Sequence, residues 1–270
     1  MTARYAQAGP YADKVVWITG ASSGIGAALA AAFSRAGARL VLSARRTAEL
    51  EKVRAGCARP DEHLVLPLDM AGGDFDGAVA SVLARFGHID VLVNNAGISQ
   101  RSRVADTVLV VDRRIMEVNY FGVVALTRAV LPVMRRQQQG SIVTISSLVG
   151  LVSTPLRSTY SASKHALHGF FEALRAEEHD NGIRVLMVCP GSIRTDVSLH
   201  ALSGDGSEHG VMDNLIDKGL PPAVCAERIL AALAAGRQQV LVAGSERHAV
   251  LIYKLFPALY RRLIRRMTVT

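Results

Sequence analysis

Cysteine is scarce in this sequence, and so are long apolar runs. Three cysteines, Cys57, Cys189 and Cys225, occur among 270 residues, too few and too scattered for a disulfide framework or a zinc site. We therefore expect free thiols and no bound metal, which suits a reducing, cytoplasmic location. No run reaches the roughly 18 apolar residues of a membrane-spanning helix, and residues 1–13 lack the apolar core of a secretory signal.

Acidic side chains are outnumbered, at 23 against 31 basic ones, which gives a net charge of +8. Such an excess can indicate a nucleic-acid-binding protein. Residues 245–270, however, hold six basic side chains and one acidic side chain, and so carry +5 of the +8. Because most of the excess belongs to this tail, we expect no nucleic-acid partner.

Short apolar runs alternate with helical stretches along most of the chain. Strands without strict polar alternation, each followed by a helix, predict a parallel sheet covered on both faces. The sequence thus predicts one doubly wound α/β (Rossmann) domain at residues 13–244. The long segment 191–222 is expected to form a substrate lid, with a disordered loop as the alternative. The runs are Val15–Thr19, Arg39–Ser43, His63–Leu68, Val91–Asn95, Ser141–Ser146, Arg184–Cys189 and Gln239–Val242, and the longest helices are Asp112–Arg136 and Ser158–His179.

A glycine cluster lies between the first predicted strand and a helical stretch from Ala27 to Ala36. Gly20 allows a tight turn, Gly24 lets the backbone approach a pyrophosphate, and Gly26 lets the helix pack close to the strand. Free amides and the helix dipole at the start of the helix favour phosphate. This strand–loop–helix context predicts a dinucleotide-binding site.

The end of the second predicted strand indicates which dinucleotide binds. An acidic residue that accepts the ribose hydroxyls of NAD is expected about twenty residues after the glycines, but Ala44 stands there, followed by Arg45 and Arg46. Guanidinium groups can donate paired, charge-assisted hydrogen bonds to a 2′-phosphate. The sequence therefore predicts NADP(H), and a solvated basic turn is the alternative.

Tyr160 and Lys164 lie four residues apart in a predicted helix, with Ser147 thirteen residues before the tyrosine. Residues four apart share a helix face, so the Lys164 ammonium should lie near the Tyr160 phenol. A nearby cation lowers the pKa of a tyrosine from its usual value of about 10. We therefore expect Tyr160 to act as a general acid and base, with Ser147 holding the substrate oxygen.

Taken together, these motifs resemble the short-chain dehydrogenase/reductase family, in its single-domain branch. Thr19–Gly26, Asn94–Gly97 and Pro190–Gly191 match its cofactor loops, and Asn119, Ser147, Tyr160 and Lys164 match its catalytic tetrad. The resemblance implies that Asn119 holds a water that links Lys164 to solvent, that Asp69 contacts the adenine, and that the protein forms dimers or tetramers. A helix cap is the other interpretation of Asp69.

The same resemblance implies a full set of cofactor contacts and a narrower relationship. The contacts are Gly20, Ser22, Ser23, Gly24, Ile25, Gly26, Arg45, Arg46, Asp69, Asn95, Ala96, Gly97, Tyr160, Lys164, Pro190, Gly191, Ile193 and Thr195. Within the family, Trp17, Leu42–Arg46, Asn94–Ser102 and Ser163–Leu167 are similar to membrane-associated reductases of steroids, retinoids and quinones.

Apolar residues around the predicted site indicate a lipophilic carbonyl or alcohol as substrate. They are Leu148–Val152, Pro155, Leu156, Leu199, Leu202, Val211, Met212, Leu215 and Ile216, and ordinary core packing is the alternative for about half of them. A 3-oxoacyl thioester reductase of fatty-acid synthesis is a second enzymatic interpretation. A non-catalytic NADP-sensing scaffold protein is a third.

Residues 245–270 predict a basic amphipathic tail. Leu251, Leu255, Leu259, Leu263 and Met267 fall four apart, as do Ile252, Phe256, Tyr260 and Ile264. Such a helix suits peripheral binding to a membrane surface through residues 251–267. Packing against a second subunit or over the lid is the alternative.

Overall fold

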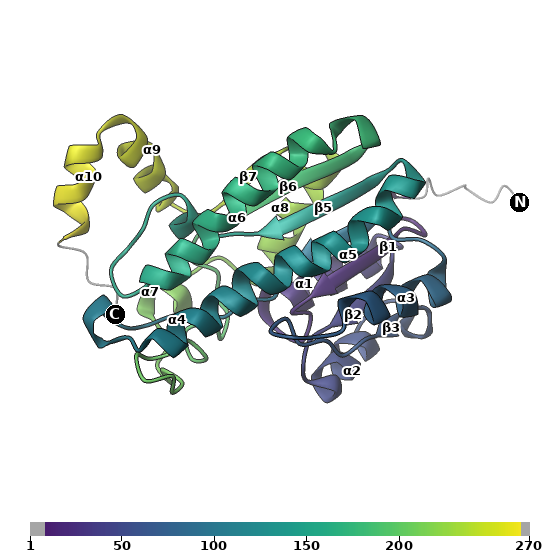
Figure 1. Ribbon diagram of the computed structural model, residues 1–270, viewed down its shortest axis with the longest axis horizontal. Helices are drawn as coiled ribbons and strands as arrows, with labels where there is room; N and C mark the ends of the chain where they lie inside the picture. The colour runs from purple at the N-terminus through teal and green to yellow at the C-terminus, as the bar shows by residue number, and fades with distance from the viewer. Residues whose placement is uncertain (1–8, 266–270) are drawn as a thin grey trace, which may run out of the picture.

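The computed structural model describes residues 9–265, and within this range the chain forms a parallel sheet of seven strands between two layers of helices (Figure 1). The strands lie in the order β3-β2-β1-β4-β5-β6-β7. They are β1 Val15–Thr19, β2 Arg39–Ser43, β3 Leu64–Val65, β4 Val91–Asn94, β5 Gly140–Ile145, β6 Ile183–Pro190 and β7 Gln239–Val242. The predicted single-domain, doubly wound α/β fold is confirmed.

The helices divide between the two faces of the sheet. α1, α2 and α8 cover one face, and α3, α5 and α6 cover the other. The helices are α1 Gly24–Arg35, α2 Thr47–Ala55, α3 Phe75–Phe86, α4 Leu109–Met116, α5 Gly122–Gln137, α6 Ser158–Glu177, α7 Asn214–Asp217, α8 Pro222–Ala234, α9 Arg247–Leu255 and α10 Pro257–Ile264.

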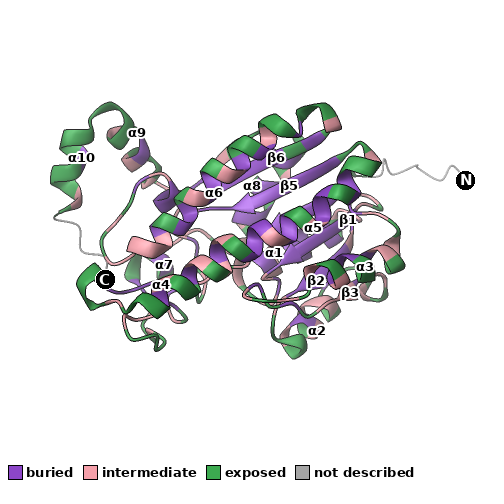
Figure 2. Cartoon of the chain, in the orientation of Figure 1, coloured by how far each residue is buried: buried purple, intermediate pink, exposed green. Residues whose placement is uncertain are grey.

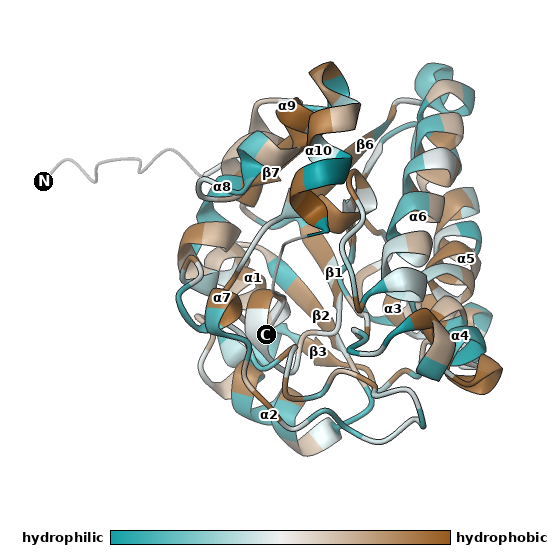
Figure 3. Ribbon diagram, turned by 90° about the vertical axis from the view of Figure 1, so that its left-hand side faces the viewer, coloured by the Kyte–Doolittle hydropathy of each residue, from teal (hydrophilic) through white to brown (hydrophobic). Residues whose placement is uncertain are grey.

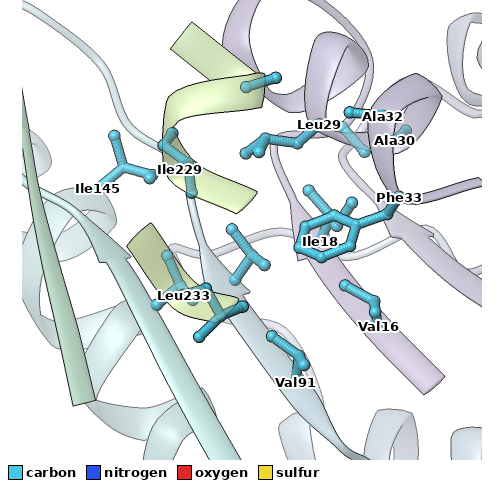
Figure 4. Close-up of a cluster of buried hydrophobic side chains, with 14 of the residues drawn as sticks. Val16, Ile18, Leu29, Ala30, Ala32, Phe33, Val91, Ile145, Ile229 and Leu233 are labelled. Carbon is cyan, nitrogen blue, oxygen red and sulfur yellow. The ribbon is translucent and has the colours of Figure 1, made fainter. Parts of the chain in front are cut away.

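Successive residues of each central strand enter two different cores. In β1, Val16 and Ile18 pack with α1 and α8, and Figure 4 shows them beside Phe33 of α1. Val15 and Trp17 point to the opposite core, against α3, α5 and α6. Both faces of the strands are therefore buried (Figure 2), and this is why the strands read as continuous apolar runs. All three cysteines are free thiols, as predicted, and all three are buried.

Strand β3, at the edge of the sheet, is shorter than the predicted His63–Leu68. Its pairing with β2 covers Leu64 and Val65 only. Beyond them, the amides of Leu66 and Leu68 still donate to the carbonyls of Leu42 and Ala44, so the chain continues alongside β2. Pro67 stands between these two residues, and the N–H that it lacks would face the open edge of the sheet, where a proline is tolerated.

The predicted helix Asp112–Arg136 is longer and contains an irregular turn. It runs from Leu109 to Gln137, with a π-helical turn at Glu117–Phe121 between α4 and α5. By length and composition this is the one described helix that could cross a membrane, although we expected none. Half of its most apolar window is buried inside the fold, where α5 packs on the sheet, so the packing is that of a core helix.

The segment 191–222 is ordered. Leu202 pairs with Gln100, and Ile193 pairs with Leu220. Its backbone also exchanges hydrogen bonds with residues 99–108, for example from the Val108 amide to the Gly204 carbonyl at 2.9 Å. The segment thus lies across the loop that follows β4, and its role as a substrate lid stays a prediction.

The predicted tail forms two helices, α9 and α10, that project from one end of the molecule (yellow in Figure 1). Val250 and Tyr260 pack against Leu148 and Val152, and the Tyr260 hydroxyl donates to the Ser153 carbonyl at 2.8 Å. Pro257 begins α10 and so breaks the predicted single helix. Met267 lies outside the described residues, and the boundary between residues 244 and 245 stays a prediction.

Candidate active site

The predicted cofactor loops meet at the carboxyl ends of β1 and β4. β1 pairs with β2 on one side and with β4 on the other, so the strand order reverses here. In open α/β sheets this switch point leaves a crevice for a ligand.

The glycines of the loop after β1 have backbones that side chains would not tolerate. Gly20 and Gly24 lie in the left-handed region, with φ values of +64° and +54°. A Cβ on Gly26 would come within 2.2 Å of the Gly20 carbonyl oxygen. Ser23 is exposed at the N-cap of α1, and its hydroxyl makes no capping hydrogen bond within the described chain. The loop is therefore a backbone cradle at the start of a helix, which suits a phosphate.

Hydrogen bonds tie the end of β4 to this cradle. The Thr19 hydroxyl accepts from the amides of Asn95 and Ala96, at 3.0 and 3.1 Å. The Asn95 side-chain amide donates to the carbonyls of Thr19 and Gly20, at 2.9 and 3.1 Å. Asn95 therefore holds the glycine loop in place, and its side chain is occupied by the protein's own backbone.

The loop after β6 reaches the same crevice from the other side. A Cβ on Gly24 would lie 3.1 Å from the Thr195 methyl group, which puts the two loops in contact. Ile193 is buried. The Ser192 amide donates to the Glu246 carboxylate at 2.9 Å, and this carboxylate also fills the space beside Gly191. Sequence reasoning missed Glu246, because it lies in the tail.

The residues predicted to select the cofactor are on the surface. Arg45 and Arg46 are exposed directly after β2, beside the glycine loop after β1. Asp69 is exposed as well, and its carboxylate accepts from the Ala71 amide at 3.0 Å. The cap of α3 is Asp74 and not Asp69, so the helix-cap interpretation of Asp69 was wrong.

The π-helical turn places Asn119 in the interior. Its side chain accepts from the Ile98 amide at 2.8 Å and donates to the Ile98 carbonyl at 2.9 Å and to the Ser163 hydroxyl at 3.1 Å. A Cβ on Gly97 would lie 3.2 Å from Asn119 Oδ1 and 3.5 Å from Lys164 Nζ. The loop after β4 thus abuts the predicted tetrad closely.

Tyr160 and Lys164 are neighbours on the inner face of α6. Lys164 Nζ lies 5.8 Å from the centroid of the Tyr160 ring and donates to the Ile145 carbonyl at 2.9 Å. Burial lowers the pKa of Lys164 to about 8. The pKa of Tyr160 is raised, because burial outweighs the opposing effects of Arg157, Ser147 and Arg101. Sequence reasoning predicted a lowered pKa and attributed it to Lys164, so the direction and the main cation were both wrong.

Ser147 completes the group of predicted catalytic residues. It follows β5, and its hydroxyl accepts from the Val149 amide at 3.3 Å and donates to the Pro190 carbonyl at 3.5 Å. The hydroxyl is also close enough to Tyr160 to lower the pKa of the phenol. The structure therefore brings Ser147, Tyr160, Lys164 and Asn119 together, beside Pro190.

Three further polar residues at this site were missed from the sequence. The Gln100 side chain accepts from the amides of Thr159 and Tyr160, at 2.9 and 3.3 Å, and so caps α6. Arg101 and Arg157 lie nearby and act electrostatically on Tyr160. A sequence signal existed for Arg157 alone, because it stands one helical turn before Tyr160.

The apolar residues predicted to line the pocket have mixed positions. Leu148 and Val152 are buried against α9 and α10, which supports the core-packing alternative for them. In the segment 191–222, Ile216 is buried, whereas Val211 and Leu215 are exposed. Within residues 9–265, no cluster of three His, Cys, Asp or Glu side chains is arranged to hold a metal ion.

Comparison with known proteins identifies the family. The family model for short chain dehydrogenase matches residues 14–204. The chain belongs to this family. It is 46% identical over 261 residues to dehydrogenase/reductase SDR family member 7B of Bos taurus, an alignment that covers 93% of this chain and 80% of the relative.

Solved structures agree on the fold. A short-chain dehydrogenase from Streptomyces avermitilis has 35% identity and a TM-score of 0.79, with 93% of this chain and 96% of that chain covered. A short chain dehydrogenase/reductase from Burkholderia phymatum, solved in complex with NAD, has 24% identity and a TM-score of 0.81, with 96% and 97% covered.

Proposed function

We propose that this short-chain dehydrogenase is an NADP(H)-dependent oxidoreductase that interconverts a carbonyl group and a secondary alcohol. The observation that carries the proposal is the position of Tyr160 and Lys164, side by side on α6, next to a glycine cradle at the switch point of the sheet.

The cradle fits a dinucleotide. Its glycines leave the backbone open where any Cβ would collide, and the amides at the start of α1 suit a pyrophosphate. When bound, the dinucleotide supplies or accepts a hydride at the substrate carbon. Arg45 and Arg46 favour NADP(H), since exposed guanidinium groups beside the cradle match a 2′-phosphate and no carboxylate stands at Ala44 to accept the hydroxyls of NAD.

The chain's own residues handle the proton. In the direction of reduction, Tyr160 donates its phenolic proton to the carbonyl oxygen while the Ser147 hydroxyl holds that oxygen. The Lys164 ammonium favours the phenolate that results. Asn119, bonded to both backbone groups of Ile98, fixes the loop beside Lys164, where we place the water that relays protons to solvent.

A lipophilic substrate is favoured by the apolar residues of the lid. Leu199, Leu202 and Met212 are half-buried and lie in the segment that crosses the loop after β4. A 3-oxoacyl thioester reductase remains the second candidate. Its carrier protein is acidic and would need a basic rim at the pocket, whereas most of the positive charge of this chain lies in the tail. A scaffold protein is disfavoured, because the four tetrad residues are all present.

We also propose that α9 and α10 contact a membrane surface. Leu251, Leu255, Leu259 and Leu263 are exposed, while Tyr260 faces the body, and Figure 3 shows hydrophobic and hydrophilic stretches alternating along these helices. Exposed Arg247, Lys254, Arg261, Arg262 and Arg265 flank the leucines. Exposed apolar and basic side chains on the same two helices suit an anionic membrane. The alternative is that α9 and α10 pack against a second subunit. Because members of the family often oligomerise, we also propose that the protein forms a dimer or tetramer.

The function is tested by following NADPH consumption with steroids, retinals, quinones and acyl thioesters. We expect turnover of at least one lipophilic carbonyl, faster with NADPH than with NADH. Fastest turnover of a 3-oxoacyl thioester would support the second candidate. Binding of NADPH without turnover of any carbonyl would contradict the enzymatic proposal and favour a sensing role.

A further inference from the structure

Three charged side chains from distant parts of the chain, two of them buried and one largely buried, meet next to Tyr160. Arg101 follows β4, Arg157 is the N-cap of α6, and Asp213 lies in the lid just before α7. Their side chains are 3%, 15% and 5% exposed, respectively. Arg101 Nε donates to the Asp213 carboxylate at 2.9 and 3.2 Å, and Arg157 Nη2 donates to it at 3.0 Å. We call this group the charge triad.

The two arginines of the triad are held very differently. Arg101 Nη1 also donates to the Ser99 hydroxyl at 3.0 Å and to the Gln100 carbonyl at 2.6 Å, so this guanidinium is well satisfied. Arg157 donates only to Asp213 among the described residues, and its Nε is buried without a partner there. If these residues served only to hold the lid in place, the ion pair between Arg101 and Asp213 would be enough. A second guanidinium with few hydrogen bonds, that of Arg157, would not be needed.

The triad carries a net positive charge. Two guanidinium groups face a single carboxylate in a buried site, which is costly unless another group benefits from the charge. Burial and the repulsion from Arg101 lower the pKa of Arg157, which is the expected sign of that cost. The group that benefits is Tyr160, one turn along α6.

Tyr160 is surrounded by charged and polar groups from several elements. Lys164 comes from its own helix, Ser147 from the loop after β5, and Arg101 from the loop after β4. The carboxylate of Asp112, in α4, accepts a hydrogen bond from the hydroxyl of Thr159, the residue before Tyr160. Among the groups that lower the pKa of Tyr160, Arg157 acts most strongly, ahead of Ser147 and Arg101.

We propose that Arg157 and Arg101, held by Asp213 of the lid, are positioning residues that stabilise the phenolate of Tyr160 and couple lid closure to proton transfer. The proposal rests on the proposed function. Asp213 brings together two cations that would otherwise repel each other, and it does so only when the lid lies across the loop after β4. In alcohol oxidation Tyr160 must first lose its proton, so closure of the lid would prepare the base.

The first test is the pH dependence of alcohol oxidation in Arg157→Met. The rate should rise with pH as Tyr160 loses its proton, and removing the cation should move this rise to higher pH by about one unit, a tenfold loss at neutral pH. Arg157→Lys, which keeps the charge, should restore most of the wild-type profile. Arg103→Met, an exposed residue of the same loop, is the matched control. A higher KM with an unmoved pH profile would show that Arg157 only holds the lid, and would overturn the proposal.

A second test needs no substrate. The ultraviolet absorbance of tyrosinate is titrated with NADP⁺ present, and the curve of Tyr160→Phe is subtracted to isolate Tyr160. Arg157→Met should move the midpoint upwards, and Arg157→Lys should not. Identical curves in wild type and Arg157→Met, or no Tyr160 signal in either, would overturn the proposal. If Arg157→Met moves the titration midpoint of Tyr160 but the wild-type protein reduces no carbonyl, the proposed function is contradicted, whereas the effect of the charge triad on Tyr160 is supported.

Discussion

Replacing Lys164 with methionine should stabilise the protein while it abolishes activity. The side chain is 4% exposed, and burial lowers the pKa of its ammonium to about 8 from the ordinary 10.5. Keeping this group charged in the folded protein at neutral pH therefore costs roughly 3 kcal/mol. Methionine has a similar length and no charge, but it cannot donate to the Ile145 carbonyl.

Loss of that hydrogen bond should cost about 1–2 kcal/mol. The net gain of Lys164→Met is then about 1–2 kcal/mol, a rise of about 3–6 °C in melting temperature. Urea unfolding without cofactor, followed by circular dichroism, measures the difference directly. Lys218→Met is the control, because Lys218 is exposed and its removal should change the free energy of unfolding little.

The gain should depend on pH in a defined way. The folded-state pKa of Lys164, about 8, lies below the unfolded value of 10.5. Below pH 8 both states carry the proton, so the wild type bears the full cost. Between these values the folded state loses its proton first, so the stability of the wild type rises with pH towards that of the variant. A Lys164→Met variant that is less stable at neutral pH, or a gain that does not shrink in alkaline buffer, would refute this reasoning.

Two further predictions concern the cofactor and the tail. Ala44→Asp with Arg45→Ala should shift preference towards NAD(H), because losing charge-assisted bonds to the 2′-phosphate costs about 1.5–3 kcal/mol, tenfold or more in affinity. If cofactor titration shows an unchanged preference for NADPH, another group binds the phosphate. Leu255→Glu with Leu259→Glu should abolish co-sedimentation with anionic vesicles at low salt, since both leucines are exposed on the tail. Leu109→Glu with Val110→Glu, at apolar positions of α4 that are at least as exposed, is the control, and equal binding by both variants would count against a membrane contact through the tail.

The fold was predictable because its central strands, such as β1, β4 and β5, are buried on both faces. The bounds of β1, β2 and β7 match the predicted runs. The exception is β3, whose regular pairing with β2 covers only Leu64 and Val65 of the longer run that was predicted as a strand. The π-helical turn that contains Asn119 left no visible signal, because its residues also fit the surrounding helical pattern.

The site was predictable where its residues lie close together in sequence. Tyr160 and Lys164 are one helical turn apart, so their spacing alone places them side by side. Arg101 and Arg157 reach Asp213 across 112 and 56 residues of sequence, respectively, and no local pattern reports such a contact. The pKa of Tyr160 was predicted in the wrong direction for a related reason. Burial of the phenol raises its pKa, and the four-residue spacing of Tyr160 and Lys164 gives no information about how deeply α6 is buried.

The roles assigned to the tetrad are tested most directly by Tyr160→Phe. This change removes the transferable proton and leaves the ring in place, so turnover of a carbonyl substrate at neutral pH should fall by a factor of about 10²–10⁴. The affinity for NADPH, measured by titration of the same protein, should stay close to that of the wild type. Turnover that remains comparable to the wild type would contradict the central claim that Tyr160 is the general acid and base.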